Sequence, residues 1–357
     1  MKSISKHAVV IRMFLLPALT AVVMITSAPR GALAGLHVVS SPFISNSSLS
    51  GTAAIADNDI WAVGRIAGAT LSNEITLAEH FNGASWGVIP TPNFQGSELD
   101  AVDGVASNDV WAVGAQKVKN NGSSQPLIEH WDGSSWTIVS SPSLRNGGSL
   151  TGVTAVSSNN VWAVGTASGS TSAFVEHWDG TSWSIVSSPA FTGGVVSGIA
   201  ADASNDVWAV GGFTKLHFNG TSWSAVPAPR TVSAGSVTVL SASDAWAAGG
   251  GQGPPPSDTE AMLEQWNGTS WTVVSSPNPD SRGTSIFTGI AAVSANDIYA
   301  VGDAADGAFI EHWNGTSWSL LTTPSGVSGL AGVTALSDGT VVAVGDGGNG
   351  SAVILHN

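Results

Sequence analysis

The chain has 357 residues, of which 43% are apolar and 10% are charged, and it contains no cysteine. This composition allows a large buried core, and it excludes disulfide scaffolds and a lipid anchor attached through an N-terminal cysteine. The formal net charge of −14 repels phosphate backbones, which excludes nucleic acid as an expected partner.

Residues 1–34 have the pattern of a secretory signal peptide. Basic residues between Lys2 and Arg12 precede an uncharged apolar run from Met13 to Thr26, which is shorter than the about 20 residues of a membrane-spanning helix. The small residues Ala32-Leu33-Ala34 then provide a cleavage site. Cleavage removes four positive charges and no acid, which changes the net charge from −14 to −18. We expect a secreted protein, with an uncleaved N-terminal anchor as the alternative.

A short unit repeats along the rest of the chain. In its second copy the unit contains Trp111-Ala-Val-Gly114, then Glu129-His-Trp131, and finally Trp136 with Pro142 six residues later. The Trp and Pro of the last element keep this spacing in six copies, at Trp86, Trp136, Trp183, Trp223, Trp271 and Trp318. Units of about 46 residues are typical of β-propeller blades. We expect repeats that start near residues 49, 99, 150, 197, 235, 287 and 330.

The two termini share the seventh unit. The C-terminal copy passes Val342-Ala-Val-Gly345 and stops at Asn357, before the Trp-x5-Pro element. Residues 36–42 supply that element, with Leu36 in the Trp position. Residues 35–48 are therefore expected to provide the last strand of this split unit. The sequence predicts an all-β fold for residues 35–357, a seven-bladed β-propeller of four-stranded antiparallel blades whose last blade is closed by the N-terminal strand.

Each unit is predicted to form four short strands. The segments are rich in β-branched and aromatic residues, and Asn, Asp, Gly, Ser and Pro separate them. In the third unit they are Leu150–Val156, Val161–Gly165, Ala173–Trp178 and Trp183–Ser187.

Asn-Gly or Asp-Gly stands between the third and fourth strands of each complete unit, and this pair predicts a two-residue type I′ hairpin. A turn at Asn314-Gly315 would pair Glu311 with Trp318. The alternation of side chains along a strand would then place Glu311, Trp313 and Trp318 on one face and His312 on the other.

Trp, His and Glu recur at fixed positions in the second, third and fourth strands. For the 15 Trp, packing between blades is favoured over platforms for sugars. The His residues come one to a unit, so we expect hydrogen bonds within each blade and not metal ligation. The Glu residues are expected to have a structural role in each unit, such as accepting a hydrogen bond from an indole N–H. The residues are His80, His130, His177, His217, His312 and His356, with Glu79, Glu129, Glu176, Glu264 and Glu311.

The loops at one end of the strands differ from unit to unit. The link between the second and third strands is long at 115–126, very short at 213–214, and contains three consecutive prolines within 250–259. Variable loops on a rigid scaffold often carry binding residues. The candidate ligand face comprises the cations Arg65, Lys117, Lys119, Arg145, Lys215 and Arg282 and the acids Asp303 and Asp306, which with Asp346 could bind a cation. Solvated surface is the alternative for the cations.

Several features resemble kelch repeats. They are Gly211-Gly212 and Gly249-Gly250 after the second strand, the hairpin from Asp132 to Trp136, and the closing Pro-Ala-Pro-Arg230. The resemblance spans the chain after residue 34 and implies a propeller like the central domain of galactose oxidase. The hairpins are also similar to the Asp-boxes of sialidases, without the residue that those place between Asp and Gly.

The enzymatic activities of these families do not carry over. A galactose-oxidase-like copper site needs a Tyr–Cys crosslink, and the chain has no Cys. A sialidase needs an Arg triad and a Tyr nucleophile, whereas Tyr299 occupies a repeat position. Phosphate-binding loops, dinucleotide fingerprints and nucleophile elbows do not occur in the sequence. We therefore predict no catalytic residue, no metal and no cofactor.

The expected function is that of a secreted, monomeric, non-catalytic propeller. It would bind a glycan or a protein partner through the variable face, with no membrane span after signal cleavage. One alternative is an extracellular polysaccharide hydrolase or lyase that uses carboxylates of the rim. A structural or adhesive surface module is another.

Overall fold

The computed structural model describes residues 36–68, 70, 73–92, 95–117, 123–168, 173–191, 196–252, 259–277, 279 and 284–357. These residues form seven sheets of four antiparallel strands, and no α-helix occurs among them. In this described part, no helix has the length and apolarity needed to cross a membrane. Gly35–Asn357 forms one compact unit. The predicted signal peptide lies outside the described residues and stays a prediction.

The strands form four concentric layers. The innermost, first strands are β2 (Ser47–Ala56), β6 (Ser97–Ala106), β10 (Gly148–Ser157), β14 (Gly198–Ala203), β18 (Val232–Ser241), β22 (Ser285–Ser294) and β26 (Val327–Ala335). The second are β3 (Asp59–Ile66), β7 (Asp109–Lys117), β11 (Asn160–Ala167), β15 (Asp206–Gly211), β19 (Asp244–Gly251), β23 (Asp297–Ala304) and β27 (Val341–Gly347). The third are β4 (Ile75–Phe81), β8 (Ser124–Trp131), β12 (Ala173–Trp178), β16 (Thr214–Phe218), β20 (Glu260–Trp266), β24 (Gly307–Trp313) and β28 (Ala352–His356). The outermost, fourth strands are β5 (Trp86–Val88), β9 (Trp136–Ile138), β13 (Trp183–Val186), β17 (Trp223–Val226), β21 (Trp271–Val274), β25 (Trp318–Leu321) and β1 (His37–Val38).

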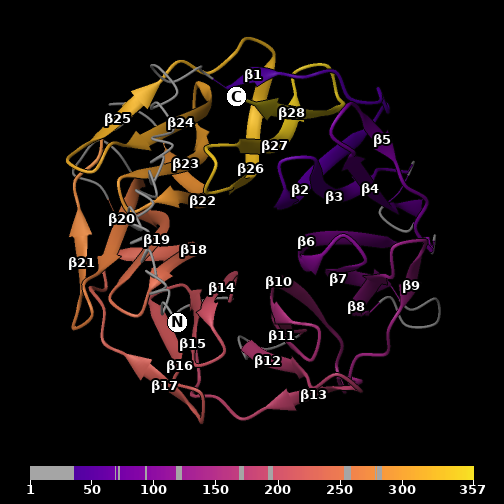
Figure 1. The fold of residues 1–357 in the computed structure, drawn as a ribbon, viewed down its shortest axis with the longest axis horizontal. Coiled ribbons are helices and arrows are strands. Elements are labelled where there is room, and N and C mark those ends of the chain that lie inside the picture. The colour runs from indigo at the N-terminus through magenta and orange to yellow at the C-terminus, as the bar shows by residue number, and fades with distance from the viewer. Residues whose placement is uncertain are drawn as a thin grey trace, which may run out of the picture. The chain divides into compact units, whose positions relative to one another are not determined.

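The sheets are the blades of a closed ring (Figure 1). Blade 1 contains β2 to β5, the next blades follow in chain order, and blade 7 contains β26, β27, β28 and β1. Each first strand contacts the first strand of the next blade, and β26 contacts β2. The predicted seven-bladed propeller is therefore confirmed.

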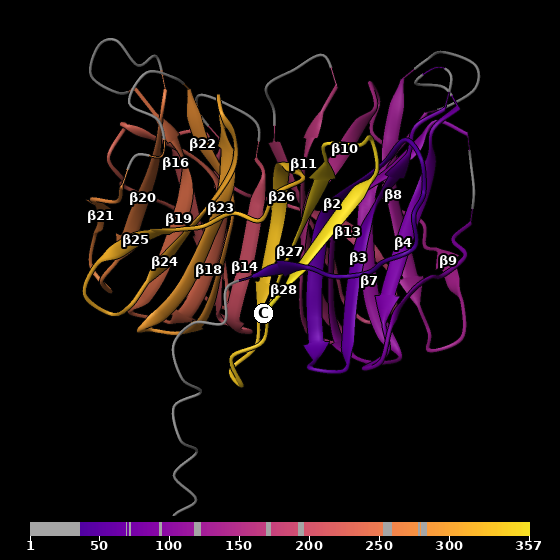
Figure 2. The same cartoon turned by 90° about the horizontal axis from the view of Figure 1, so that it is seen from above.

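The strands run side by side along the axis of the ring, so the connections between them gather at its two ends (Figure 2). We call the end where second strands finish and third strands begin the loop rim. The opposite end, the turn rim, carries the short turns between first and second strands, such as Asp57-Asn58. Arg65, Asp303 and Asp306 of the candidate ligand face lie at the loop rim.

The N-terminal strand closes the ring as predicted. His37 of β1 pairs with His356 of β28, and Val38 pairs with Leu355. Leu36, in the position that other blades give to Trp, is buried in a cluster with Leu330 and Leu355. Blade 7 therefore joins both ends of the described chain.

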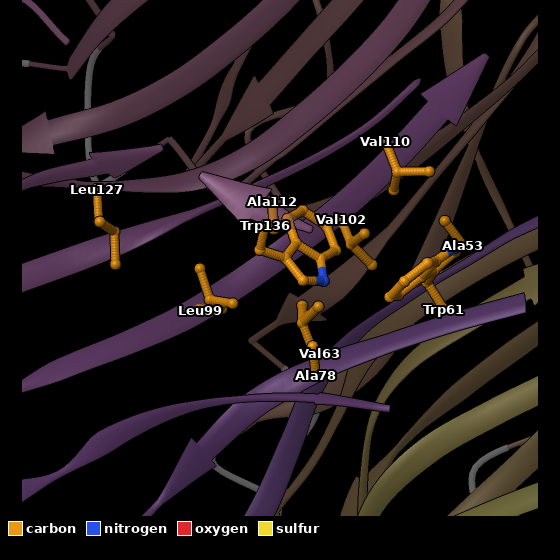
Figure 3. Packing of buried hydrophobic residues seen from close by; sticks show 10 residues of the cluster. All are labelled: Ala53, Trp61, Val63, Ala78, Leu99, Val102, Val110, Ala112, Leu127 and Trp136. Carbon is orange, nitrogen blue, oxygen red and sulfur yellow. The ribbon is translucent and has the colours of Figure 1, made fainter. Parts of the chain in front are cut away.

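Aromatic side chains fill the junctions between blades. Trp61 of blade 1 is fully buried, and its ring centroid lies 5.1 Å from that of Trp131 and 5.2 Å from that of Trp136 in blade 2. Trp136 packs in one cluster with Val63 of blade 1 and Val102 of its own blade (Figure 3). Burying each such ring contributes on the order of 2–3 kcal/mol. The Trp residues thus pack between the blades, as predicted from the repeat.

The recurring His residues are tied within their blades. His80 Nε2 lies 2.8 Å from Asp59 Oδ1, and the His80 ring stacks on Trp61 with the centroids 4.3 Å apart. Equivalent bonds join His130 to Asp109, His177 to Asn160, His217 to Asp206 and His312 to Asp297. The prediction of within-blade hydrogen bonds is confirmed for these five.

The hairpin between third and fourth strands differs from the prediction. Trp313 pairs directly with Trp318, and Glu311 pairs with Leu320, so residues 314–317 form a four-residue loop. Asn314 Oδ1 accepts the backbone N–H groups of Thr316 and Ser317 at 2.9 and 3.0 Å. Gly315 has a φ of 88°, whereas Asn314 is not in the positive-φ region that a type I′ turn requires. The predicted register was wrong by two residues, which leaves the assignment of faces unchanged.

The indole N–H groups also have other partners than expected. Trp111 and Trp208 donate to Asp109 and Asp206 of their own second strands. Trp131 donates to the backbone oxygen of Ser107 in the adjacent turn. In the described part of the chain no indole N–H donates to the repeated Glu carboxylates. That prediction was wrong.

Candidate functional site

Three consecutive blades carry a charge at one repeat position of the loop rim. Arg65, Asp303 and Asp346 each follow the glycine that ends the Trp-Ala-Val-Gly element, in blades 1, 6 and 7. The other blades have small uncharged residues there, namely Ala115, Thr166, Gly212 and Gly250. The charges therefore belong to the individual protein and not to the repeat.

Arg65 connects blade 1 to blade 2. Its Nη1 lies 2.6 Å from Glu98 Oε2 and 3.8 Å from Glu74 Oε1. Glu98 is near the start of β6, two residues before Asp100. Burial raises the pKa of Asp100 to about 7, the negative charge of Glu98 adds to this, and Arg65 opposes it. The single guanidinium therefore faces several carboxyl groups.

Asp303 and Asp346 continue this cluster into blades 6 and 7. Asp303 Oδ1 accepts the backbone N–H of Leu330 at 2.9 Å, which links blade 6 to blade 7. Burial raises the pKa of Asp303. The pKa of Asp346 is raised by burial and by the charge of Asp303, and it is lowered by Arg65.

These groups interact as one electrostatic cluster, which we call the acidic rim. It consists of Arg65, Glu74, Glu98, Asp100, Asp303 and Asp346. Arg65 interacts with Glu74, Glu98, Asp100 and Asp346. Asp303 joins the cluster through its charge interaction with Asp346, so the five carboxyl groups span four consecutive blades. Arg65 and Glu98 are partly exposed and Asp346 is exposed, so solvent screens these interactions. The carboxyl groups outnumber the guanidinium, and the negative charge of the cluster can attract a cation.

The other predicted residues of this face are spread around the loop rim. Lys117 is half-buried at the end of β7, Arg145 is exposed in the connection before β10, and Asp306 is exposed between β23 and β24. Lys119 and Arg282 lie outside the described residues. The structure brings Arg65 and Asp303 together through Asp346. Lys117 lies beside the acidic rim, since its backbone N–H donates to Gly96, whose own N–H donates to Glu74. Arg145 and Asp306 are exposed on the loop rim.

Lys215 is not a residue of the rim surface, which corrects the prediction. It lies in β16 with its side chain fully buried, and its Nζ forms an ion pair with Glu264 of blade 5. The corresponding positions in blades 3 and 5 hold Val175 and Leu263. Both faces of β16 are covered by neighbouring blades, since Leu216 packs toward blade 3 and Lys215 faces Glu264 of blade 5. Sequence reasoning did not apply this enclosure to Lys215.

Glu74, Glu98 and Asp100 were missed by sequence reasoning. The first strand of unit 2 begins Ser-Glu-Leu-Asp, where units 1 and 3 have Ser48 with Ser50 and Ser149 with Thr151. This local loss of the repeat was a usable signal for Glu98 and Asp100. Glu74 precedes a third strand in a connection without a repeat pattern, and the sequence offers no comparable signal for it.

A channel of about 350 Å³ runs between the first strands, and its lining includes Thr52, Val102, Val153 and Asp103. The carboxylate of Asp103 accepts the backbone N–H groups of Gly104 at 2.9 Å and Ala155 at 2.8 Å. It therefore joins blades 2 and 3. Among the described residues, no group of three or more His, Cys, Asp or Glu side chains is arranged to hold a metal ion.

Neither protein-family models nor curated proteins match this sequence. Solved structures do match in fold. The structure of YCF48 bound to D1 peptide covers 90% of this chain and 96% of its own, with a TM-score of 0.61 and 14% identity. The WD40 β-propeller domain of Doa1 covers 90% and 97%, with a TM-score of 0.59 and 11% identity. The extracellular domain of the putative one component system BT4673 from B. thetaiotaomicron covers 89% and 39%, with a TM-score of 0.57 and 9% identity.

These likenesses agree with the class of protein that the strand order defines, a seven-bladed β-propeller. At such identities the likeness concerns the fold alone, because one propeller fold carries many unrelated functions.

Proposed function

We propose that this protein is a non-catalytic binding propeller whose acidic rim takes a positively charged segment of a protein partner. The observation that carries the proposal is a cluster of five carboxyl groups on four consecutive blades, in which Arg65 interacts with four and Asp303 with Asp346. Burial and mutual repulsion raise the pKa values of Asp100 and Asp346. A Lys or Arg side chain placed among them would relieve that repulsion, and complementary charge gives both fast association and specificity.

Two further observations support a peptide partner. YCF48, which has a similar fold, was solved with D1 peptide bound. In this chain the acidic rim lies where the copies of the repeat differ most, and binding residues on rigid scaffolds are concentrated at such positions.

The proposal includes the protein's location and its repeat type. We place it outside the cell, because residues 1–34 have the pattern of a signal peptide. We also propose that it is a monomer. We assign its repeats to the kelch-like, galactose-oxidase-like type on Gly211-Gly212, Gly249-Gly250 and the hairpin from Asp132 to Trp136.

Calorimetric titration with short Lys- and Arg-rich peptides tests the proposal, with Glu-rich peptides of equal length as the ligand control. The variant Asp303→Asn/Asp346→Asn keeps the size of both side chains and removes their charge. We expect it to lower the affinity at least about tenfold. The matched control is Asp132→Asn/Asp179→Asn, which changes two exposed acids of the hairpins at the turn rim. This control should bind as the unaltered protein does.

The affinity should also depend on salt and on pH. Salt screens exposed charges, so the affinity should fall as ionic strength rises. A bound cation favours ionised carboxylates, so the affinity should rise as the pH passes about 7, where Asp100 loses its proton. Equal binding of acidic and basic peptides, or an unchanged affinity of the Asp303→Asn/Asp346→Asn variant, would contradict the proposal.

The second candidate function is hydrolysis or elimination of an extracellular polysaccharide. It is favoured by the interaction of Asp303 with Asp346, since two carboxyl groups with shifted pKa values can serve as acid and base. Release of reducing sugar or unsaturated ends from a polysaccharide panel, abolished by Asp346→Asn, would establish it. Complete absence of turnover would leave the binding function.

A further inference from the structure

Two grooves open at equivalent positions on the outer wall of the ring, away from the acidic rim. The groove between blades 7 and 1 has a volume of about 610 Å³, and its lining includes Ser40, Ser41, Pro42, Phe81, Ser85 and Trp86. The groove between blades 3 and 4 has a volume of about 500 Å³, with Ser187, Ser188, Pro189, Phe218, Ser222 and Trp223 at the same repeat positions. Each groove lies between the fourth strand of one blade and the outer hairpin of the next. Figure 1 shows β1 and β5 at the outside of the ring.

A change of one aromatic residue accounts for the grooves. The third strand ends with Trp in blades 2, 3, 5 and 6, and with Phe81 or Phe218 in blades 1 and 4. Trp131 donates its indole N–H to the Ser107 backbone oxygen at 3.1 Å, and it reaches Trp61 of the preceding blade. The smaller ring of Phe has no N–H for such a bond. It therefore leaves space at these two junctions.

The larger groove lies at a junction that retains fewer Trp residues. Val342 takes the place of the second-strand Trp in blade 7. With Phe81 in the next blade, two of the three Trp positions that meet at this junction hold smaller side chains, and Trp86 holds the third. The junction between blades 3 and 4 retains Trp162 and Trp223, which agrees with its smaller volume.

Phe43 provides an independent observation beside the larger groove. It directly follows Pro42, and 72% of its surface is exposed, the largest value among the exposed hydrophobic side chains. At the same repeat position blades 2, 4 and 6 have the polar residues Ser143, Arg230 and Ser325. Pro42 lines the groove and Phe43 is its neighbour in the chain, so the exposed Phe43 can extend the apolar surface of the groove.

The chemistry of the lining indicates the class of ligand. Phe81, Trp86 and Pro42 offer apolar faces, while Ser40 and Ser85 offer hydroxyl groups. The imidazole of His356, whose pKa is lowered by burial, lines the larger groove, and no carboxylate, ammonium or guanidinium group is among the described residues that line either groove. A pyranose ring presents an apolar C–H face and a polar edge of hydroxyl groups, which such a lining can pair with.

We propose that the groove between blades 7 and 1 is a binding subsite for a neutral polysaccharide, with Phe43 and Phe81 as its aromatic contacts. The equivalent groove between blades 3 and 4 is a second, smaller subsite. Two subsites on one rigid ring would raise the affinity for a long chain through multivalency. This site is separate from the acidic rim and does not depend on the function proposed there.

Affinity electrophoresis of the full chain in gels containing dextran, laminarin, galactomannan or xyloglucan tests this proposal. The main variant is Phe81→Trp, which fills the groove with the residue that four other blades carry at this position. Because the repeat accommodates Trp there, its melting temperature should be at least that of the unaltered protein. We expect at least one of these polysaccharides to retard the unaltered protein. Phe81→Trp and Phe43→Ser should each weaken its binding at least about tenfold.

Three controls make the outcome decisive. The Asp303→Asn/Asp346→Asn variant should bind polysaccharide normally, since its changes lie at the acidic rim. Phe218→Trp should reduce binding less than Phe81→Trp does. The proposal is overturned if none of the four polysaccharides retards the protein, or if Phe81→Trp and Phe43→Ser bind as the unaltered protein does. A loss of binding only in Phe218→Trp would also overturn it, because the subsite would then lie between blades 3 and 4.

Discussion

Lys215 of blade 4 forms an ion pair with Glu264 of blade 5, and neither side chain is exposed to solvent. The repeat pattern explains why a buried Glu stands at position 264. Blades 1, 2, 3, 5 and 6 have a buried Glu at this third-strand position, whereas blades 4 and 7 have Leu216 and Leu355. Of these five carboxyl groups, Glu264 is the one that meets a cation, while Glu79 and Glu129 have no hydrogen-bond partner among the described residues.

Replacing Lys215 with Leu should destabilise the ring. The variant leaves Glu264 in the interior without its cation, and breaking a buried ion pair in this way costs about 3–5 kcal/mol of unfolding free energy. Urea denaturation at neutral pH measures the loss. The double variant Lys215→Leu/Glu264→Leu should recover most of the stability, because it places at each position a Leu that other blades already have there, Leu263 of blade 5 for Lys215 and Leu216 or Leu355 for Glu264. A single variant as stable as the unaltered protein would show that the pair contributes nothing.

Glu129 should make the protein less stable as the pH rises. Burial raises its pKa from 4.5 to about 8, so between these values the folded chain holds a proton that the unfolded chain has released. The unfolding free energy therefore falls with increasing pH in this window, by at most about 1.4 kcal/mol per pH unit for a single group. The variant Glu129→Gln stays neutral, so it should be more stable than the unaltered protein at about pH 9 and similar to it at about pH 5.

The control for this measurement is Asp132→Asn. The hydroxyl of Ser134 and the backbone N–H groups of Ser134 and Ser135 lower the pKa of the exposed Asp132 to about 2. Any stability that it contributes is lost only as the pH falls below the ordinary value for Asp. Asp132→Asn should therefore leave the pH profile above about pH 5 unchanged. Identical profiles for Glu129→Gln and the unaltered protein would show that Glu129 is already ionised in the folded chain.

Leu36 should be needed for closing the ring. It is buried against Leu330 and Leu355 at the end of the described chain, and truncation of a buried Leu to Ala costs about 2–5 kcal/mol. Thermal unfolding of Leu36→Ala should show a lower melting temperature. Phe43→Ser, seven residues later and largely exposed, should unfold as the unaltered protein does. An unaffected Leu36→Ala variant would mean that the N-terminal strand does not contribute to blade 7.

The fold could be predicted because its information is repeated. The Trp-x5-Pro element and the division of one unit between Leu36 and Asn357 determine the number of blades and the closure. The hairpin register could not be predicted from Asn-Gly, since this pair fits a two-residue turn as well as the four-residue loop that Asn314 forms with Thr316 and Ser317. That choice depends on side-chain hydrogen bonds.

The candidate site was less accessible to sequence reasoning. Arg65 and Asp303 stood out because the repeat does not require them, but their connection through Asp346 crosses three blades. Lys215 looked similar in the sequence and proved to be buried, since its position in β16 faces the next blade. A charge on a strand can be assigned to a core or a surface only when the register of that strand is known.

Photo-crosslinking tests most directly that a basic segment binds at the acidic rim. A Lys-rich peptide with a benzophenone group would be irradiated with the full chain, and mass spectrometry would locate the attachment. The account predicts attachment to segments around the ends of β3, β23 and β27, with loss of crosslinking in Asp303→Asn/Asp346→Asn. Crosslinks at the turn rim, or crosslinks that persist in that variant, would contradict it.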